Sequence, residues 1–282
     1  MVSPRISQKI AFTVLFALAV VVIAPIVVIL FVLVKNGISA INWDFLSQMP
    51  RNGMKVGGIF PAIVGTLLLV FGTTLFALPV GVCAAIYLSE YAPKNRLTRF
   101  IRLSIVNLAG VPSIVHGLFG LGLFVLFFGF GTSLLAGWLT LSILILPVII
   151  TASEEALRAV PMGLREASYA LGASKWQTIR RVVLPSALPG ILTGAILGVG
   201  RAAGETAPIL FTVAAFYLPH LPGSIFDQVM ALPYHLYVIA TQVPNIPREF
   251  QYGTALVLIS LVFGINLIAI IIRYFYRRAK RW

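Results

Sequence analysis

Long runs of apolar residues, separated by short polar segments, dominate the chain. Six runs are long enough to cross a bilayer, which takes about 20 apolar residues in a helix. They cover residues 10–34, 62–88, 103–128, 133–151, 191–216 and 255–272. The third is interrupted near Gly110, Pro112 and Gly117. The pattern predicts an all-α integral membrane protein with six transmembrane helices. We expect a single domain over 1–282, with a core at about 62–272 and the first span on its N-terminal side.

Composition supports a membrane protein and changes the meaning of the charge. Hydrophobic residues make up 59% of the chain and charged residues 10%, well below the quarter typical of soluble domains. A net charge of +13 would suggest nucleic acid as a partner of a soluble chain. Here the basic residues flank apolar runs, so membrane lipid explains them better and no nucleic-acid partner is expected.

The distribution of Lys and Arg predicts the orientation. The N-terminus, the second and fourth connections and the C-terminus together carry sixteen, whereas the first, third and fifth connections carry four. Because cytoplasmic segments are enriched in Lys and Arg, both termini are predicted to be cytoplasmic. The same rule places the polar segment at 166–185 in the cytoplasm.

This polar segment predicts a helix, a turn and a second helix lying on the membrane surface. Gly172 stands where a helix C-cap would be, and Ser174 and Gln177 have the spacing of a capping box. Trp176, Ile179 and Val183 would share one side of the second helix, which Pro185 would end. An ordinary connecting loop is the alternative reading.

The spacing within the segment resembles the EAA signature of permease subunits of ATP-binding-cassette importers. That signature is Glu-Ala-Ala, three residues, Gly, nine residues, then Ile-x-Leu-Pro; Ser168 replaces an Ala and Val182 an Ile. The matching residues are Glu166, Ala167, Ser168, Gly172, Val182, Leu184 and Pro185. The resemblance implies a type I importer permease fold, and a loop that docks into a cytoplasmic ATPase.

Arg201 and Glu205 are the clearly intramembrane charges. Arg201 is about ten residues from the predicted start of its run, roughly 15 Å deep and near mid-bilayer. A four-residue separation would place both on one helix face, with Gly194 and Gly198 continuing the stripe. Small residues let a partner helix approach, so this face meets protein or a water-filled path. Either a structural ion pair or an anion pathway would explain the charges.

The stretch 200–208 (GRAAGETAP) resembles a signature of phosphate-importer permeases, as do 110–120 (GVPSIVHGLFG) and 57–66 (GGIFPAIVGT). The resemblance extends over most of the chain and points to the A-type permeases of bacterial phosphate importers. It implies a bacterial inner-membrane location and a substrate pathway through Arg201 and Glu205. The implied partners are a second homologous permease in a heterodimer, two copies of an ATPase and an extracytoplasmic phosphate-binding protein.

Other readings follow from the same residues. A permease for sulfate or molybdate would share the EAA-like loop, and an autonomous channel would not require it. A membrane enzyme would need a cluster of catalytic groups, but the eight acidic residues are scattered. Since no Gly-rich P-loop is present, we expect no cofactor in this chain, with ATP and Mg²⁺ bound by the partner ATPase. His116, His220 and His235 lack metal-ligand spacing, and a hydrogen-bonded helix contact is favoured for His116.

The two longer connections on the other side offer fewer signals. Residues 36–60 contain Trp43 and Phe45, which could anchor at the interface. Residues 217–252 hold five prolines, and a short helix broken at Pro233 is predicted over 226–242. This segment could be a simple capping loop or a docking surface for an extracytoplasmic partner.

Overall fold

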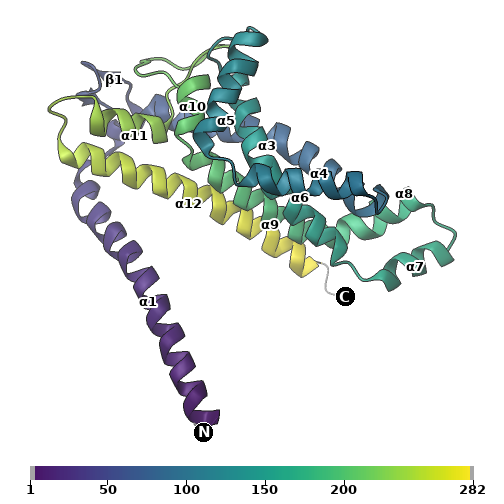
Figure 1. Cartoon of the computed structure of the whole chain (residues 1–282). Coiled ribbons are helices and arrows are strands. Elements are labelled where there is room, and N and C mark those ends of the chain that lie inside the picture. Colours follow the sequence, from purple (N-terminus) through teal and green to yellow (C-terminus); the bar gives the residue numbers. More distant parts are fainter. Residues whose placement is uncertain (1–3, 280–282) are drawn as a thin grey trace.

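A computed structural model describes residues 4–279 as an elongated bundle of helices (Figure 1). Lys280 and Arg281, which belong to the charge count above, lie outside the described residues. The elements are α1 (Pro4–Gly37), η1 (Ile38–Ala40), α2 (Trp43–Ser47), β1 (Pro50–Arg51), β2 (Val56–Gly57), α3 (Phe60–Ile86), η2 (Tyr87–Tyr91), α4 (Arg96–Ala109), α5 (Ser113–Gly120), η3 (Leu121–Phe127), α6 (Leu134–Arg158), α7 (Met162–Ala170), α8 (Lys175–Thr178), η4 (Ile179–Val183), α9 (Leu184–Gly204), α10 (Ala207–Thr212), α11 (Leu232–Thr241) and α12 (Arg248–Ala279).

The helix inventory confirms the predicted fold class. Within residues 4–279, five helices are long and apolar enough to cross a membrane, and a bent pair makes a sixth when counted as one span. The π-helical turns η2 and η4 extend α3 and precede α9. α1 is apolar on all sides and leaves the bundle near the start of α12 (Figure 1).

The centre of the bundle consists of α3, α6 and α9, packed through small residues. Gly72 of α3 lies against the indole ring of Trp138 in α6, and a Cβ at this position would overlap the ring. The Trp138 Nε1–H donates to the carbonyl of Leu68 at 2.9 Å. On α9, a Cβ at Gly194 would lie 2.6 Å from the Cβ of Ala152. These contacts bring the helices to a separation that larger side chains would prevent.

The third apolar run is broken, as its sequence predicts. α4 and the α5–η3 helix meet at a bend of 103°. Pro112 at the bend has φ −56° and ψ 140° and cannot donate a backbone hydrogen bond. However, Gly117 lies inside α5 and does not interrupt it. The helix also begins before residue 103, because the Asn95 side chain caps α4 by accepting from the Thr98 N–H.

The fifth apolar run was predicted with the wrong boundaries. The helix is continuous from Lys175 through η4 and α9 to Gly204, where it ends. Pro185 does not end the preceding helix as expected. It lies in the first turn of α9, where a missing N–H donor is tolerated. The rest of the run forms α10.

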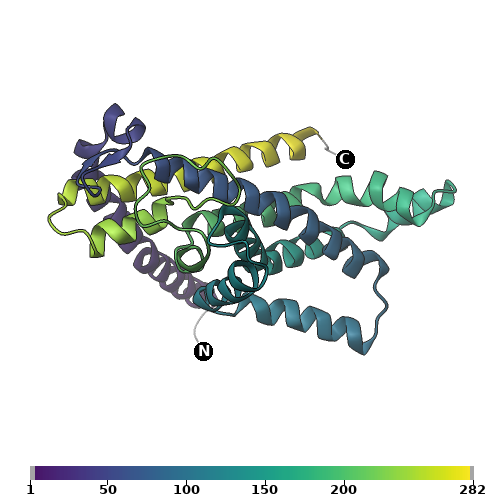
Figure 2. The same cartoon turned by 90° about the horizontal axis from the view of Figure 1, so that it is seen from above.

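The end of the bundle opposite α7 and α8 is built from irregular segments and short elements (Figure 2). An antiparallel hairpin, in which Pro50 faces Gly57 and Arg51 faces Val56, was not predicted. α11 begins at Leu232, so the expected helix over 226–242 is shorter, and Pro233 starts it instead of breaking it. Buried Phe45, Met54 and Ile239 belong to one hydrophobic cluster that joins these elements.

Replacing Gly72 with Val tests the packing of α3 on α6. The added methyl groups would displace the Trp138 ring, and overpacking costs about 1–3 kcal/mol. We expect a lower midpoint of thermal unfolding for the detergent-purified protein, followed by circular dichroism. Gly264→Val is the matched control, since the space around Gly264 in α12 is open. Equal midpoints for the two variants would contradict the close contact.

Candidate functional site

The two groups of site residues predicted from the sequence lie at opposite ends of one continuous helix. This helix runs from Lys175 to Gly204 and includes α8, η4 and α9. The EAA-like loop contributes its first turns, and Arg201 lies in its last turn. A helix of this length spans roughly 45 Å at 1.5 Å per residue. The structure therefore does not bring the two groups together but connects them through one continuous helix.

Arg201 and Glu205 form an ion pair where the helix stops. The Arg201 Nε donates to Glu205 Oε1 at 3.2 Å, and the side chains are 34% and 15% exposed. Glu205 has the extended backbone angles φ −72° and ψ 133°, so it follows the helix rather than sharing its face. The helix begins at Lys175 and not at residue 191, so the count of about ten residues from the start of the run does not give the depth of Arg201. The two residues do pair, but they pair where α9 ends and not along one face of a continuous helix.

Neighbouring helices fix this broken end. The side chain of Asn266 in α12 lies against Gly200, 3.0 Å from where a Cβ would be. After the break, Pro208 packs against Gly117 of α5: a Cβ added at Gly117 would lie 2.9 Å from the Cα of Pro208. Gly117 and Gly200 are therefore required for close approach. Contacts with α12 and α5 thus flank the ion pair on both sides along the chain, while about a third of the Arg201 side chain remains exposed.

The EAA-like loop has the local structure that its sequence predicts. α7 contains Glu166 and Ala167, and Gly172 adopts a left-handed φ of +79° in the turn after it. Ser174 and Gln177 make both hydrogen bonds of a capping box. Ser168 donates or accepts a 2.9 Å hydrogen bond with Thr178, which ties α7 to α8. The serine that departs from the EAA pattern thus has a partner of its own.

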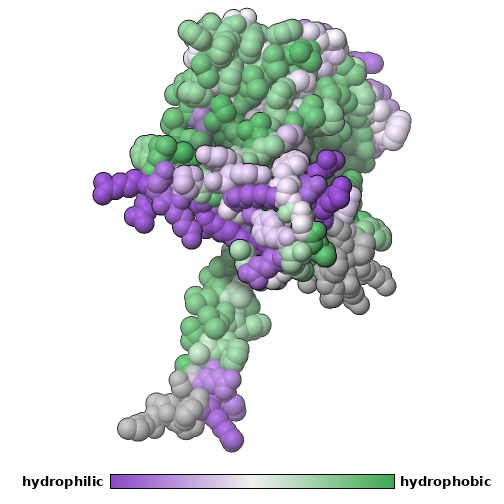
Figure 3. All heavy atoms as spheres, turned by 90° about the vertical axis from the view of Figure 1, so that its right-hand side faces the viewer, coloured by the Kyte–Doolittle hydropathy of each residue, from purple (hydrophilic) through white to green (hydrophobic). Residues whose placement is uncertain are grey.

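The outer face of this loop exposes large apolar side chains. Leu171 at the tip is 89% exposed, Met162 is 62% exposed and Trp176 is 54% exposed. Of the three residues predicted to share one side of the second helix, Ile179 and Val183 are buried, whereas Trp176 is exposed. Hydrophilic residues gather over the same end of the molecule (Figure 3). Exposed apolar residues within a polar surface are typical of a protein docking site.

Arg165 anchors the loop, and sequence reasoning missed it. Its guanidinium pairs with Glu90 at 2.9 Å and donates to the carbonyls of Leu157 and Val160. Both charged side chains are only 10% exposed. The partners come from η2 and from the C-terminal end of α6, so this one side chain joins α7 to two core helices. The available signals were the position of Arg165 directly before Glu166 and an acidic residue at the end of an apolar run.

The described residues contain no cluster of His, Cys, Asp and Glu that could hold a metal ion. The ring of His116 makes the predicted helix contact, since its Nδ1 lies 3.3 Å from the carbonyl of Pro112. His235 is enclosed in α11, and burial lowers its pKa to about 4. The imidazole is therefore neutral at physiological pH.

Comparisons with known proteins agree with this geometry. The family model of the "binding-protein-dependent transport system inner membrane component" matches residues 77–281. The chain is 39% identical to the phosphate transport system permease protein PstA 1 of Mycobacterium tuberculosis, over 98% of this chain and 91% of the relative. It is 38% identical to the probable ABC transporter permease protein YqgI of Bacillus subtilis, over 93% and 94%.

Solved structures show the same fold. A bacterial ABC transporter for the polysaccharide alginate gives a TM-score of 0.65 at 15% identity, covering 98% of this chain and all of that one. The inward-facing MetNI methionine transporter gives 0.62 at 22% identity, covering 78% and 95%. Fold and loop thus define an importer permease of type I. The chain belongs to the binding-protein-dependent transport system inner membrane component family and is a transmembrane permease subunit of an ABC importer. The resemblance to phosphate-importer permeases is confirmed by its relatives.

Arg165→Met tests whether the buried pair holds the loop in place. Removing one partner leaves the Glu90 carboxylate buried without its cation, which typically costs about 3–5 kcal/mol. We expect faster proteolysis within residues 159–184 and a lower thermal midpoint. Arg180→Met is the control, because Arg180 is an exposed cation of the same loop. If both variants resist protease equally, Arg165 does not anchor α7.

Proposed function

We propose that this chain forms half of the translocation pathway of an ATP-driven phosphate importer in the bacterial inner membrane. It pairs with a second, homologous permease as a heterodimer. Two copies of a cytoplasmic ATPase and an extracytoplasmic phosphate-binding protein complete the complex. ATP and Mg²⁺ are bound by the ATPase, and this chain is not itself an enzyme. The relatives named for phosphate transport support the choice of substrate.

The ion pair at the end of α9 is the observation that carries the proposal. A planar guanidinium can donate two parallel hydrogen bonds to an oxyanion, so Arg201 is suited to contact phosphate. Glu205 neutralises Arg201 between passages, which prevents the anion from being trapped. Its carboxylate also accepts a hydrogen bond from the P–OH group that phosphate carries near neutral pH. Sulfate lacks this proton and would leave the carboxylate unpaired, which favours phosphate over sulfate.

The EAA-like loop supports the coupling to an ATPase. Exposed Leu171, in the turn after α7, and Trp176 of α8 form the contact surface, and Arg165 fixes that surface to the core helices. In this arrangement α8 continues into α9, so the ATPase contact and the ion pair share one helix. The excess of Lys and Arg in the corresponding segments supports a cytoplasmic location for this end and for both termini.

Gly172→Val tests the coupling role. The left-handed backbone at this position disfavours any residue with a Cβ, although the space around it is open. We therefore expect an inserted permease with a distorted turn that no longer co-purifies with the ATPase. Gly163→Val, in the same loop, has equally open surroundings but no positive φ and serves as the control. If Gly172→Val still co-purifies with the ATPase in full, the loop only connects two helices and has no coupling role.

Replacing Arg201 with Met and Glu205 with Gln together separates a pathway pair from a structural pair. The double change removes both charges and keeps the side-chain size. A structural pair predicts that uptake is largely restored relative to either single change. A pathway pair predicts a complex that assembles and keeps its ATPase but takes up phosphate at least about tenfold more slowly. This factor is the effect of losing one charge-assisted hydrogen bond.

Labelled phosphate and sulfate uptake by cells carrying the complete importer provides the measurement. Arg201→Lys retains the charge but loses the planar guanidinium with its two parallel donors. We expect this variant to keep only part of the wild-type phosphate uptake. Near-normal phosphate uptake by the double variant would defeat the pathway assignment. If uptake of sulfate, and not of phosphate, depends on the pair, the substrate is a different oxyanion from phosphate.

A further inference from the structure

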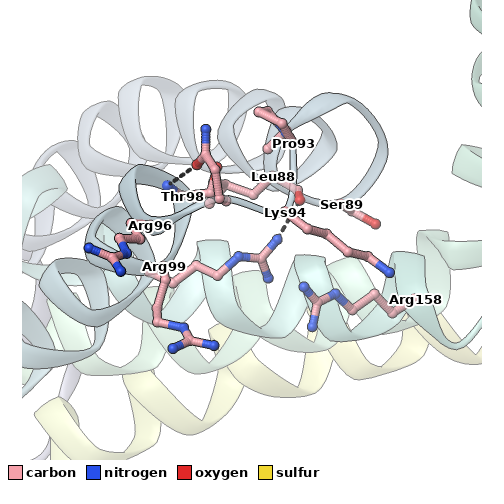
Figure 4. Close-up of a pocket in the computed structure, with 11 residues that line it drawn as sticks. Leu88, Ser89, Pro93, Lys94, Arg96, Thr98, Arg99 and Arg158 are labelled. Carbon is pink, nitrogen blue, oxygen red and sulfur yellow. Dashed lines mark hydrogen bonds between the residues drawn. The ribbon is translucent and has the colours of Figure 1, made fainter.

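A basic pocket lies at the same end of the molecule as α7 and α8, under the connection between η2 and α4. It has a volume of about 970 Å³ and is open to the surroundings. Five cationic side chains from three parts of the chain line it. They are Lys94 of the connection, Arg96, Arg99 and Arg102 of α4, and Arg158 of α6 (Figure 4). Neither the ion pair at the end of α9 nor the EAA-like loop contributes a residue to the pocket.

The positive charge of the pocket is only partly balanced. Glu154, just outside the lining, pairs with both Arg102 and Arg158, the latter at 2.7 Å. Within residues 4–279, neither Lys94 nor Arg99 forms an ion pair with a carboxylate. Arg102 is held in position by a further hydrogen bond to the carbonyl of Leu88 at 2.5 Å. Two of the five cations are thus held in place by Glu154, and the other three are exposed and keep an uncompensated positive charge.

Exposed apolar residues alternate with the cations along the sequence of α4. On α4, Leu97 is 64% exposed and Phe100 is 68% exposed, next to the exposed Arg96 and Arg99 along the chain. A helix with basic and exposed apolar residues is suited to a membrane interface, where cations meet headgroups and apolar residues meet acyl chains.

We propose that this pocket binds a phosphate oxyanion, and that the oxyanion is the headgroup phosphate of an anionic phospholipid. Guanidinium and ammonium groups bind phosphate oxygens through charge-assisted hydrogen bonds. The exposed apolar residues of α4 favour a lipid over free inorganic phosphate, since free phosphate has no acyl chain to cover them. The site is separate from the proposed substrate pathway, and the binding test below does not depend on transport.

The test compares lipid retention by purified full chains. The wild type and a Lys94→Gln, Arg99→Gln variant are mixed with phosphatidylglycerol, and bound lipid is counted by native mass spectrometry. Both residues are exposed and outside the ion pairs, so the variant keeps its packing. We expect its affinity for phosphatidylglycerol to fall about fivefold for each charge removed. A Lys94→Arg, Arg99→Lys variant should bind as the wild type does.

Two further arms separate the sources of the anion. Arg51→Gln with Lys55→Gln removes two exposed cations at the opposite end of the bundle and should leave lipid retention unchanged. Inorganic phosphate is offered in parallel to the wild type and to the Lys94→Gln, Arg99→Gln variant, and zwitterionic phosphatidylcholine tests the need for net negative charge. We expect phosphatidylglycerol to bind more tightly than either.

The outcomes decide the assignment. Equal phosphatidylglycerol retention by the pocket variant and by the opposite-end variant would overturn the proposal. Binding of inorganic phosphate through Lys94 and Arg99, without retention of phosphatidylglycerol, would overturn the lipid assignment. Loss of a co-purifying ATPase with unchanged lipid retention would identify the pocket as a protein contact instead.

Discussion

The close approach of α9 to α6 is the constraint on which the positions of the EAA-like loop and of the ion pair depend. Gly194 faces Ala152 and Gly198 faces Ile149, so the two helices meet along a path that excludes larger side chains. In a bilayer, where apolar lipid offers no hydrophobic penalty against separation, such van der Waals contact is a main source of helix association. Because α9 is held along its length, the loop before it and the ion pair after it have fixed positions relative to each other.

The number of membrane-spanning helices and the local structure of the EAA-like loop could be predicted from the sequence. A left-handed Gly172 and a capping box at Ser174 are short-range features, set by residues a few positions apart. Helix boundaries near proline were less predictable. Pro185 was expected to stop a helix, but a proline in the first turn of α9 needs no N–H donor, and η4 carries the helix through.

The sequence likewise indicated which residues form the ion pair but not where the pair lies in the fold. Its members could be predicted because two charges in an apolar run need each other. Their placement required knowledge of where α9 ends, and Pro208, three residues beyond Glu205, was the available signal that the helix does not continue. The bond from Arg165 to Glu90 joins residues 75 positions apart in the sequence, so the local signals at each residue did not identify them as partners.

Arg165 also determines how a force on the loop would be distributed. Its bonds reach η2 at the end of α3 and two carbonyls at the end of α6, while α8 and η4 continue directly into α9. A displacement of α7 by a docked partner must therefore either break these buried bonds or move the ends of all three core helices. Breaking them is costly because both charges are buried. The less costly response is for the helices to follow, and the wide turns η2 and η4 lie at the points where α3 and α9 would adjust.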